Sequence, residues 1–285
     1  MILFKRSSHL REYLSVKRRE EMSVGFVPTM GALHQGHLSL IRRSKTENNL
    51  TVCSIFVNPA QFNDPKDLDK YPRPIEKDIE LLCSVECDVL FMPHNEEIYP
   101  DGINHLKNYD LGHLENFLEG VSRPGHFKGV ANVVDRLLQI IQPDKLYLGQ
   151  KDFQQVKVIE SGIRNSEFGN KKTAVVMCEI VREKDGLAMS SRNVRLNETQ
   201  RRNAAGISRE LFFIRDHWKE FELSKLKQEA IQRINSIPEA HVDYLEFCDA
   251  EKFVIIHDWN EAEKIVCVTS VIVGGVRLLD NVLIK

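Results

Sequence analysis

The sequence predicts an α/β protein in which a doubly wound, Rossmann-like parallel sheet is followed by a smaller α+β domain. First, the early part of the chain alternates continuous apolar runs with helical patterns, which is typical of parallel strands covered on both faces. Second, the pattern changes after Arg182 to a polar, glycine-containing segment. Third, 285 residues exceed what one small core needs. We therefore expect one domain over 1–182 and a smaller one over 183–285.

Five apolar runs are the expected strands of the sheet. They cover residues 24–28, 50–58, 88–93, 145–149 and 173–181. Between them, Pro74 suits a first helical position, and apolar residues follow it at helical spacing. That stripe consists of Ile75, Ile79, Leu82 and Cys83. A second helix is expected over 129–142, ended by Pro143.

The first 22 residues are rich in Lys and Arg, but they do not read as a targeting segment. Glu12, Glu20 and Glu21 are atypical of a transit peptide, and no apolar stretch follows as in a signal peptide. We expect an amphipathic first helix in a cytoplasmic protein. The cysteines lie mostly in apolar stretches, where a thiol is a small core residue. Cys83 and Cys87 have no second pair that would complete a zinc site.

The C-terminal part predicts two helices and a mostly antiparallel sheet. Asn197 is the expected N-cap of the first helix, with Gln200 at the third helical position, and a second helix follows over 224–234. The expected strands are 242–250, 252–257, 263–273 and 274–281.

Charge and hydropathy exclude two classes of partner. Lys and Arg number 39 and Asp and Glu 41, which gives a net charge of −2. A nucleic-acid surface needs an excess of basic residues, so nucleic acid is not an expected partner. No apolar run approaches the roughly 18–20 residues of a membrane-spanning helix. A local basic pocket for a small anion stays compatible with this balance.

Polar loops directly follow four of the predicted strands, and in open α/β sheets ligands bind at the carboxyl ends of the strands. The first of these loops carries His34, Gly36 and His37 immediately before a helix. A helix N-terminus favours anions, and two imidazoles can donate hydrogen bonds to phosphate. The alternative is an ordinary turn with surface histidines.

The other loops add groups that suit a nucleotide and a polar substrate. Lys151 with Asp152, and Met189 through Arg192, match phosphate oxygens, while Gln61 and the pair Gln154–Gln155 supply neutral amides. Taken singly, these groups also fit a solvated ion pair, a polar linker and surface amides. Together, without a nucleophile and its base, they indicate nucleotidyl transfer. The P-loop and GxGxxG motifs are absent.

Long motifs then carry a family resemblance over essentially the whole chain. PTMGALHQGH, FVNPAQF, YPR, RPGHFKGV, GQKDFQQ and REKDGLAMSSRN occur in this order. The chain thereby resembles the pantothenate synthetase (pantoate–β-alanine ligase) family of HxGH nucleotidyltransferases. The resemblance implies a cytoplasmic homodimer whose smaller domain closes over the active site. It departs at Pro74, where Thr is expected.

The resemblance implies ligation of (R)-pantoate and β-alanine with ATP, accompanied by Mg²⁺, through a pantoyl adenylate. Pantothenate, AMP and diphosphate are the products. His37, His34, Lys151 and Arg192 are the implied catalytic residues, with His37 as proton donor or as stabiliser of the leaving phosphates. The implied ATP-binding residues are Met30, Gly31, His34, Gly36, His37, Gly149, Lys151, Asp152, Val181, Met189, Ser190, Ser191 and Arg192. The implied pantoate-binding residues are Asn58, Gln61 and Gln155, with Gln61 also meeting β-alanine.

Arg123 and His126 of RPGHFKGV are expected near pantoate. Two alternatives stay open from the sequence. One is another HxGH nucleotidyltransferase acting on a different small carboxylate or phosphate, and the other is a nucleotide sensor without activity. The paired amides disfavour the first alternative, and the intact set of His34, His37, Lys151 and Arg192 disfavours the second.

Overall fold

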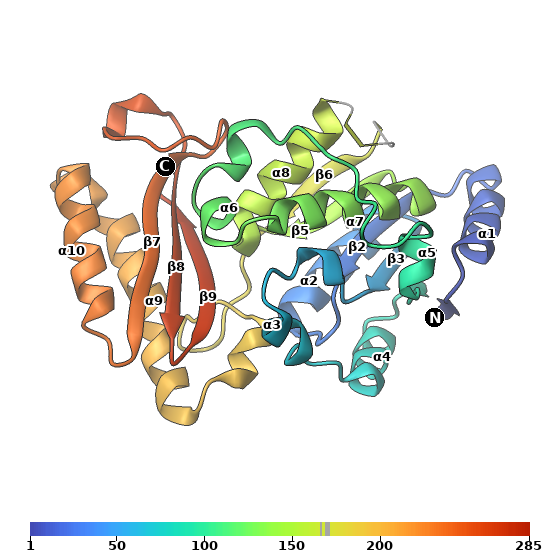
Figure 1. The fold of residues 1–285 in the computed structure, drawn as a ribbon, viewed down its shortest axis with the longest axis horizontal. Coiled ribbons are helices and arrows are strands. Elements are labelled where there is room, and N and C mark those ends of the chain that lie inside the picture. The colour runs from blue at the N-terminus through green and yellow to red at the C-terminus, as the bar shows by residue number, and fades with distance from the viewer. Residues whose placement is uncertain (166, 169–171) are drawn as a thin grey trace. The chain divides into compact units, whose positions relative to one another are not determined.

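A parallel sheet of six strands organises the first of two compact units (Figure 1). The computed structural model describes residues 1–165, 167–168 and 172–285. The first unit comprises Met1–Gly149 with Gln154–Cys178, and the second comprises Gln150–Phe153 with Glu179–Lys285. The strand order is β1-β4-β3-β2-β5-β6, and every pairing in this sheet is parallel. The predicted doubly wound α/β architecture is confirmed.

The strands of this sheet are short, and helices separate them along the chain. The strands are β1 Ile2–Phe4, β2 Val24–Thr29, β3 Leu50–Ile55, β4 Val89–Phe91, β5 Lys145–Gly149 and β6 Ala174–Cys178. The helices are α1 Ser7–Arg19, α2 Gln35–Glu47, α3 Pro65–Asp69, α4 Ile75–Ser84, α5 Asn95–Ile98, α6 Glu119–Ser122, α7 His126–Ile141 and α8 Phe153–Arg164. The 3-10 turns are η1 Pro59–Gln61, η2 Gly112–Glu115 and η3 Gln150–Asp152.

All five predicted strands are present, three of them shorter than expected at their ends. The sequence analysis missed β1, which pairs with β4 at the edge of the sheet. Its residues Ile2 and Leu3 are 45% and 44% exposed, so this strand lacks the near-continuous burial of β2, β3 and β4. The predicted first helix is confirmed as α1.

Helix α4 differs from its prediction in a way that bears on the site. Pro74 is the N-cap residue and not the first helical residue. Ile75 is 42% exposed and Cys83 is exposed, whereas Leu82 is buried and Ile79 packs against the core, so the predicted apolar stripe is only partly the buried face. The buried side chains of α4 are Asp78 and Leu82. A carboxylate therefore lies on the buried face of α4, where the predicted stripe does not include it.

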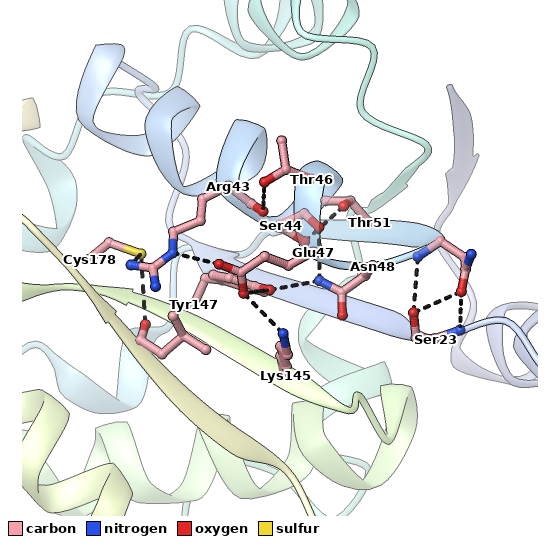
Figure 2. A network of polar contacts seen from close by, with 12 residues as sticks. Ser23, Arg43, Ser44, Thr46, Glu47, Asn48, Thr51, Lys145, Tyr147 and Cys178 are labelled. Atoms are coloured by element: carbon pink, nitrogen blue, oxygen red, sulfur yellow. Dashed lines mark hydrogen bonds and ion pairs between the residues drawn. The ribbon is translucent and has the colours of Figure 1, made fainter.

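The C-terminal end of α2 is fixed to the sheet by a polar network (Figure 2). The Glu47 carboxylate accepts hydrogen bonds from Arg43 Nε at 2.9 Å, Tyr147 Oη at 2.9 Å and Lys145 Nζ at 3.1 Å. The Arg43 guanidinium also donates to the carbonyl oxygen of Met177 in β6 at 3.3 Å. These three donors lower the pKa of Glu47 to about 2, with Arg43 the largest contributor. The network ties α2 to β5 and β6.

The second unit is an antiparallel sheet of β7 Ala240–Asp249, β8 Ile265–Val273 and β9 Val276–Leu283, with the order β7-β8-β9. Two helices, α9 Glu198–His217 and α10 Leu223–Asn235, share one apolar core with the sheet. The turns in this unit are η4 Ser191–Arg195, η5 Trp218–Glu220 and η6 Trp259–Glu261. The smaller α+β unit is thus confirmed.

Two local predictions in this unit have different outcomes. Asn197 and Gln200 form the predicted capping box, since each side chain accepts the backbone N–H of the other. The strand predicted over 252–257 is wrong, because only an isolated bridge joins Ile255 to Cys248. Phe253 there has a φ of 52°, which interrupts extended backbone. The domain boundary predicted at residue 182 stays a prediction.

All six cysteines are free thiols, and all but Cys83 are buried. Within the part of the chain that the structure describes, none of the helices has the length and apolar character needed to traverse a lipid bilayer.

We expect the Glu47 network to make folding stability sensitive to acid. The pKa of Glu47 is lower in the folded state than its ordinary value of 4.5, so its contribution is fully present above about pH 4.5. The contribution is lost as the pH falls toward about 2. Glu47→Gln should therefore destabilise the protein at neutral pH and flatten the pH dependence of stability between these values. Urea unfolding at several pH values measures this.

Glu80→Gln on the exposed side of α4 is the matched control and should retain the wild-type acid profile. An unchanged profile for Glu47→Gln would show that the network does not couple protonation to folding.

Candidate functional site

The loop between β2 and α2 lies at the carboxyl edge of the sheet, beside the segment that follows β3. Thr29 at the end of β2 pairs with Ile55 at the end of β3. The Thr29 hydroxyl donates to the carbonyl oxygen of Ser54 at 2.6 Å and accepts the N–H of Gly31 at 3.2 Å. Because β2 and β3 are parallel neighbours, the segments that leave them start side by side. The structure thus brings the His34 loop and the Asn58–Gln61 turn to one edge, as predicted.

This loop turns sharply through two residues in the left-handed region. Gly31 has a φ of +79° and Ala32 a φ of +49°. Left-handed backbone is unfavourable for alanine, so the surrounding structure must hold it. The Asp78 carboxylate accepts the N–H of Ala32 at 2.8 Å and that of Leu33 at 2.7 Å. Burial raises the pKa of Asp78, and these two hydrogen bonds oppose that effect.

His34 and His37 cap the N-terminus of α2 reciprocally. His34 Nδ1 accepts the N–H of Gly36 at 3.2 Å, and His37 Nδ1 accepts the N–H of His34 at 3.3 Å. The two rings lie with their centroids 4.0 Å apart. A neutral imidazole whose Nδ1 accepts carries its proton on Nε2. The cap therefore makes Nε2 the donor atom of both rings.

This cap changes how the helix N-terminus can meet an anion. The sequence predicts that both the helix N-terminus and the two imidazoles meet the anion, and the structure shows that the N–H groups of His34 and Gly36 donate to imidazole nitrogens. In neutral rings with this cap, Nε2 is the nitrogen that carries the proton. The positive end of the helix dipole still favours negative charge there. The arrangement suits an anion that accepts from side chains.

The turn after β3 holds two amides in a defined orientation. Asn58 Oδ1 accepts the backbone N–H of Ala60 at 3.2 Å, and Asn58 Nδ2 donates to the carbonyl oxygen of Gly129 at 3.1 Å. Both backbone groups have fixed polarity, so they determine which way the Asn58 amide points. Asn58 Nδ2 also donates to Gln61 Oε1 at 3.0 Å. The Gln61 amide is consequently oriented with Oε1 toward Asn58. Its Nε2 faces away from Asn58 and is the hydrogen-bond donor of this side chain.

Tyr99 completes this arrangement from the segment after α5. Its hydroxyl donates to Asn58 Oδ1 at 2.7 Å. Burial raises the pKa of Tyr99, so the hydroxyl stays a protonated donor across the physiological range. Tyr99, Asn58 and Gln61 thus form one chain of hydrogen bonds that ends at the Gln61 amide.

Helix α7 packs against this turn at unusually short distance, and Gly129 permits the approach. A Cβ atom at Gly129 would lie 2.2 Å from the carbonyl oxygen of Ala60. In the same helix, His126 Nδ1 lies 2.9 Å from the carbonyl oxygen of Gln61. Arg123, which follows α6, places its Nη1 3.2 Å from His126 Nε2. Arg123 and His126 therefore support the backbone of Gln61.

The two neighbouring glutamines at the start of α8 have different environments. Gln154 is buried, and its Nε2 donates to the carbonyl oxygens of Leu114 at 2.8 Å and Phe117 at 3.0 Å. Gln154 thus fixes the segment around η2 and is a structural residue. Gln155 is partly exposed and stays the predicted ligand amide.

The second unit contains the predicted nucleotide residues Lys151, Asp152, Val181 and 189–192, whereas Met30 and Gly149 belong to the first unit. Lys151 Nζ pairs with Asp152 Oδ1 at 2.7 Å, and the carbonyl oxygen of Lys151 accepts from Asn281 Nδ2 at 3.0 Å. Asn281 follows Asp280, which is 4% exposed and forms a bidentate ion pair with Arg182 at 2.7 and 2.9 Å. Burial raises the pKa of Asp280, and Arg182 opposes that effect. Strand β9 therefore anchors the Lys151 loop.

Val181 and Met189 begin and end a short hairpin in this unit. The N–H of Met189 donates to the carbonyl oxygen of Val181 at 3.0 Å. Ser190 follows as the N-cap of η4, and its hydroxyl accepts the N–H of Arg192 at 3.2 Å. Ser190, Ser191 and Arg192 thus lie on one tight turn that begins where the hairpin ends.

Asp78, Tyr99 and Asp280 were not predicted. Tyr99 binds the predicted residue Asn58, whereas Asp78 and Asp280 bind sequence neighbours of predicted residues. A signal existed for Asp78, because it lies on the helical face that Leu82 shares and yet is charged. Tyr99 is 41 residues from Asn58 in the sequence, and Asp280 is 98 residues from Arg182, so no local pattern marks them.

Comparison with known proteins identifies relatives over the full chain. The family model described as pantoate–β-alanine ligase matches residues 2–283. A protein of Cytophaga hutchinsonii named pantothenate synthetase is 44% identical over 100% of this chain and 99% of its own length. A protein of the same name from Porphyromonas gingivalis is 40% identical over 99% of both.

Solved structures of proteins with these names are also similar to this chain. Pantothenate synthetase from Thermus thermophilus superposes with a TM-score of 0.90 at 37% identity, covering 99% of both chains. Pantoate–β-alanine ligase from Francisella tularensis, complexed with β,γ-ATP and β-alanine, gives a TM-score of 0.79 at 36% identity. That match covers 99% of this chain and 97% of the other.

Gly129→Ala tests the close packing of α7 by whether the substitution raises or lowers the stability of the protein. Alanine normally stabilises a helix interior relative to glycine by about 1 kcal/mol. Here the new Cβ meets backbone atoms of Ala60, which cannot rotate away, so we expect a net destabilisation of about 1–3 kcal/mol. Thermal unfolding measures the change.

Gly206→Ala in α9 is the control, because its Cβ would meet only the end of the Ile237 side chain, which can rotate. A Gly129→Ala variant at least as stable as the wild type would rule out the close approach of α7 and η1.

Proposed function

This chain belongs to the pantoate–β-alanine ligase family, and we propose that it joins (R)-pantoate to β-alanine in two steps through an enzyme-bound pantoyl adenylate. In the first step, a carboxylate oxygen of pantoate attacks the α-phosphorus of ATP. The bond from that phosphorus to the bridging oxygen breaks, and diphosphate leaves. In the second step, the amine of β-alanine attacks the acyl carbon, loses a proton, and releases AMP.

The reciprocal cap of His34 and His37 is the observation that carries the first step. It holds two Nε2–H donors at the positive end of α2, where negative charge accumulates on the departing phosphates. Carboxylate attack on phosphorus requires no proton to be removed. We therefore assign His37 and His34 to electrostatic stabilisation of the leaving diphosphate. His37 as a proton donor is the alternative role, and it needs no different geometry.

The remaining assignments follow the chemistry of each group. Lys151 and Arg192 supply positive charge for the phosphates, with Ser190 and Ser191 as hydroxyl donors. Asp152 pairs with Lys151 and so holds its side chain. The further ATP-binding residues proposed are Met30, Gly31, Gly36, Gly149, Val181 and Met189.

For pantoate we propose Gln61, Gln155 and Asn58, with Gln61 also meeting β-alanine. A Gln61 amide fixed with Nε2 as its outward donor suits a carboxylate or hydroxyl oxygen of a small substrate. Asn58 acts through Gln61, because its own amide is held by the backbone of Ala60 and Gly129.

Mg²⁺ is proposed to accompany ATP. Among the described residues, no group of three or more His, Cys, Asp and Glu side chains forms a metal site. This fits an ion that binds through substrate phosphates and its own water ligands, which is the usual manner for Mg²⁺. Asp152 is the carboxylate nearest in sequence to the proposed phosphate ligands. The ion would neutralise phosphate charge.

A cytoplasmic homodimer is also proposed, on the family resemblance alone. Sedimentation equilibrium of the purified protein tests the oligomeric state directly.

One mixture tests the proposed function: ATP, (R)-pantoate and β-alanine with the purified protein. We expect equimolar pantothenate and AMP, and exchange of labelled diphosphate into ATP that depends on pantoate and not on β-alanine. Exchange with another small acid but not with pantoate would contradict the substrate assignment and favour a different HxGH nucleotidyltransferase. A lack of ATP turnover with every acid would contradict the activity.

Lys151→Ala should separate catalysis from binding. Loss of a charge that acts mainly on the developing diphosphate should slow adenylate formation by about 10²–10³, with a much smaller change in ATP affinity. Rapid-quench measurement of the first half-reaction, together with ATP titration, gives both quantities. Lys157→Ala, whose ammonium pairs with Glu160 at 3.1 Å, is the control. A first half-reaction at wild-type speed in Lys151→Ala would remove Lys151 from the mechanism.

A further inference from the structure

We propose that Asp78 is a positioning residue for adenylate formation, because its carboxylate holds the β2–α2 loop in the conformation that places His34 and His37. The inference rests on the proposed function. It concerns a residue in α4 that lies outside all the motifs that carry the family resemblance. The nearest of these motifs, YPR, ends at Arg73, before α4 begins.

Asp78 is 1% exposed, which is unusual for an aspartate. Among the described residues, its carboxylate accepts from the backbone of the β2–α2 loop, with Oδ2 bound to Ala32 N and Oδ1 to Leu33 N. Each oxygen thus takes one N–H of two consecutive residues. A buried charge is costly without such partners, so the position of the loop and the burial of the carboxylate depend on each other.

The two N–H groups belong to Ala32, which is in the left-handed turn, and to Leu33, which directly follows it. Ala32 has a φ of +49°, and Gly31 before it has a φ of +79°. Consecutive N–H groups in such a turn point to the same side, where a single carboxylate can accept both. A Cβ atom at Gly31 would lie 3.0 Å from Asp78 Oδ2, so the carboxylate also packs directly against the turn.

The hydrogen bonds of Asp78 to the loop also determine the position of the imidazoles, because His34 directly follows the loop. Leu33 is bound by Asp78, and His34 is the next residue and the N-cap of α2. The reciprocal cap requires the N–H of His34 to face His37 Nδ1. If the loop leaves its left-handed turn, that N–H changes direction, the cap opens, and the Nε2 donors move. A shift of about 1 Å in a reacting group can cost roughly 10²-fold in rate.

Asp78→Asn tests the proposal with almost no change in side-chain size. An amide has one acceptor oxygen, so one of the two loop N–H groups would face an NH₂ group. We expect the pantoate-dependent exchange of diphosphate into ATP to fall by about 100-fold at saturating substrates, with KM for pantoate within twofold. Pantoate is the reference ligand because none of its proposed amides lies on the β2–α2 loop: Asn58 and Gln61 are on the turn after β3, and Gln155 is in α8.

Asp144→Asn is the matched control. The Asp144 carboxylate accepts the backbone N–H of Val24 at 2.7 Å at the opposite end of the same strand, β2. Its loss should affect stability and leave the exchange rate per folded molecule within twofold of the wild type. Thermal unfolding of both variants normalises the rates to folded protein.

A second substitution distinguishes loop positioning from general stability. Glycine adopts left-handed backbone readily, so Ala32→Gly should recover about tenfold of the lost exchange rate in the Asp78→Asn background. It should recover nothing in the Asp144→Asn background. Ala32→Val in the otherwise wild-type chain should reproduce the loss, because a β-branched residue disfavours a φ of +49°.

The outcomes separate the two proposals. Absence of pantoate-dependent exchange in the wild type would overturn the proposed function. Exchange in folded Asp78→Asn within threefold of the wild type would overturn the role of Asp78 alone. If Asp78→Asn does not fold, the exchange rate of Ala32→Val tests the positioning role instead. Near-wild-type exchange in Ala32→Val overturns that role, and a loss of about 100-fold supports it.

Discussion

The turn from β2 into α2 is the constraint on which the rest of the first unit's site depends. The backbone must leave a central strand, pass through left-handed φ values at Gly31 and Ala32, and enter a helix at Gln35. Sterics disfavour this path for alanine, and the buried carboxylate of Asp78 compensates by accepting two backbone N–H groups. Charge-assisted hydrogen bonds of this kind contribute about 1.5–3 kcal/mol each. The reciprocal imidazole cap then follows directly from the turn.

Helix α2 is fixed at both of its ends by different chemistry. Its N-terminus is held by the capped turn, and its C-terminus by Glu47, which binds Tyr147 and Lys145 of β5 (Figure 2). A helix held in this way cannot slide along the sheet, so the imidazoles keep their position relative to the turn after β3. The turn after β3 packs closely against α7, because Gly129 has no side chain.

Local patterns in the sequence were sufficient to predict the parallel sheet, the position of α2 and the Asn197 cap, because burial and capping leave short-range signals. Asp78 was not predicted, since the apolar stripe through Ile75 suggested a different buried face for α4. Tyr99 and Asp280 support their partners across long stretches of sequence, and no spacing rule reveals such contacts. The roles of the nucleotide residues came from family motifs. The contacts that hold the loops carrying these residues are visible only in the fold.

A crystal structure of the protein with α,β-methylene ATP tests the central claim most directly. The account predicts that phosphate oxygens accept from Nε2 of His34 and His37 while both Nδ1 atoms keep their backbone partners and Ala32 keeps its left-handed φ. Phosphates bound away from the N-terminus of α2, or imidazoles that release the cap to reach them, would contradict it.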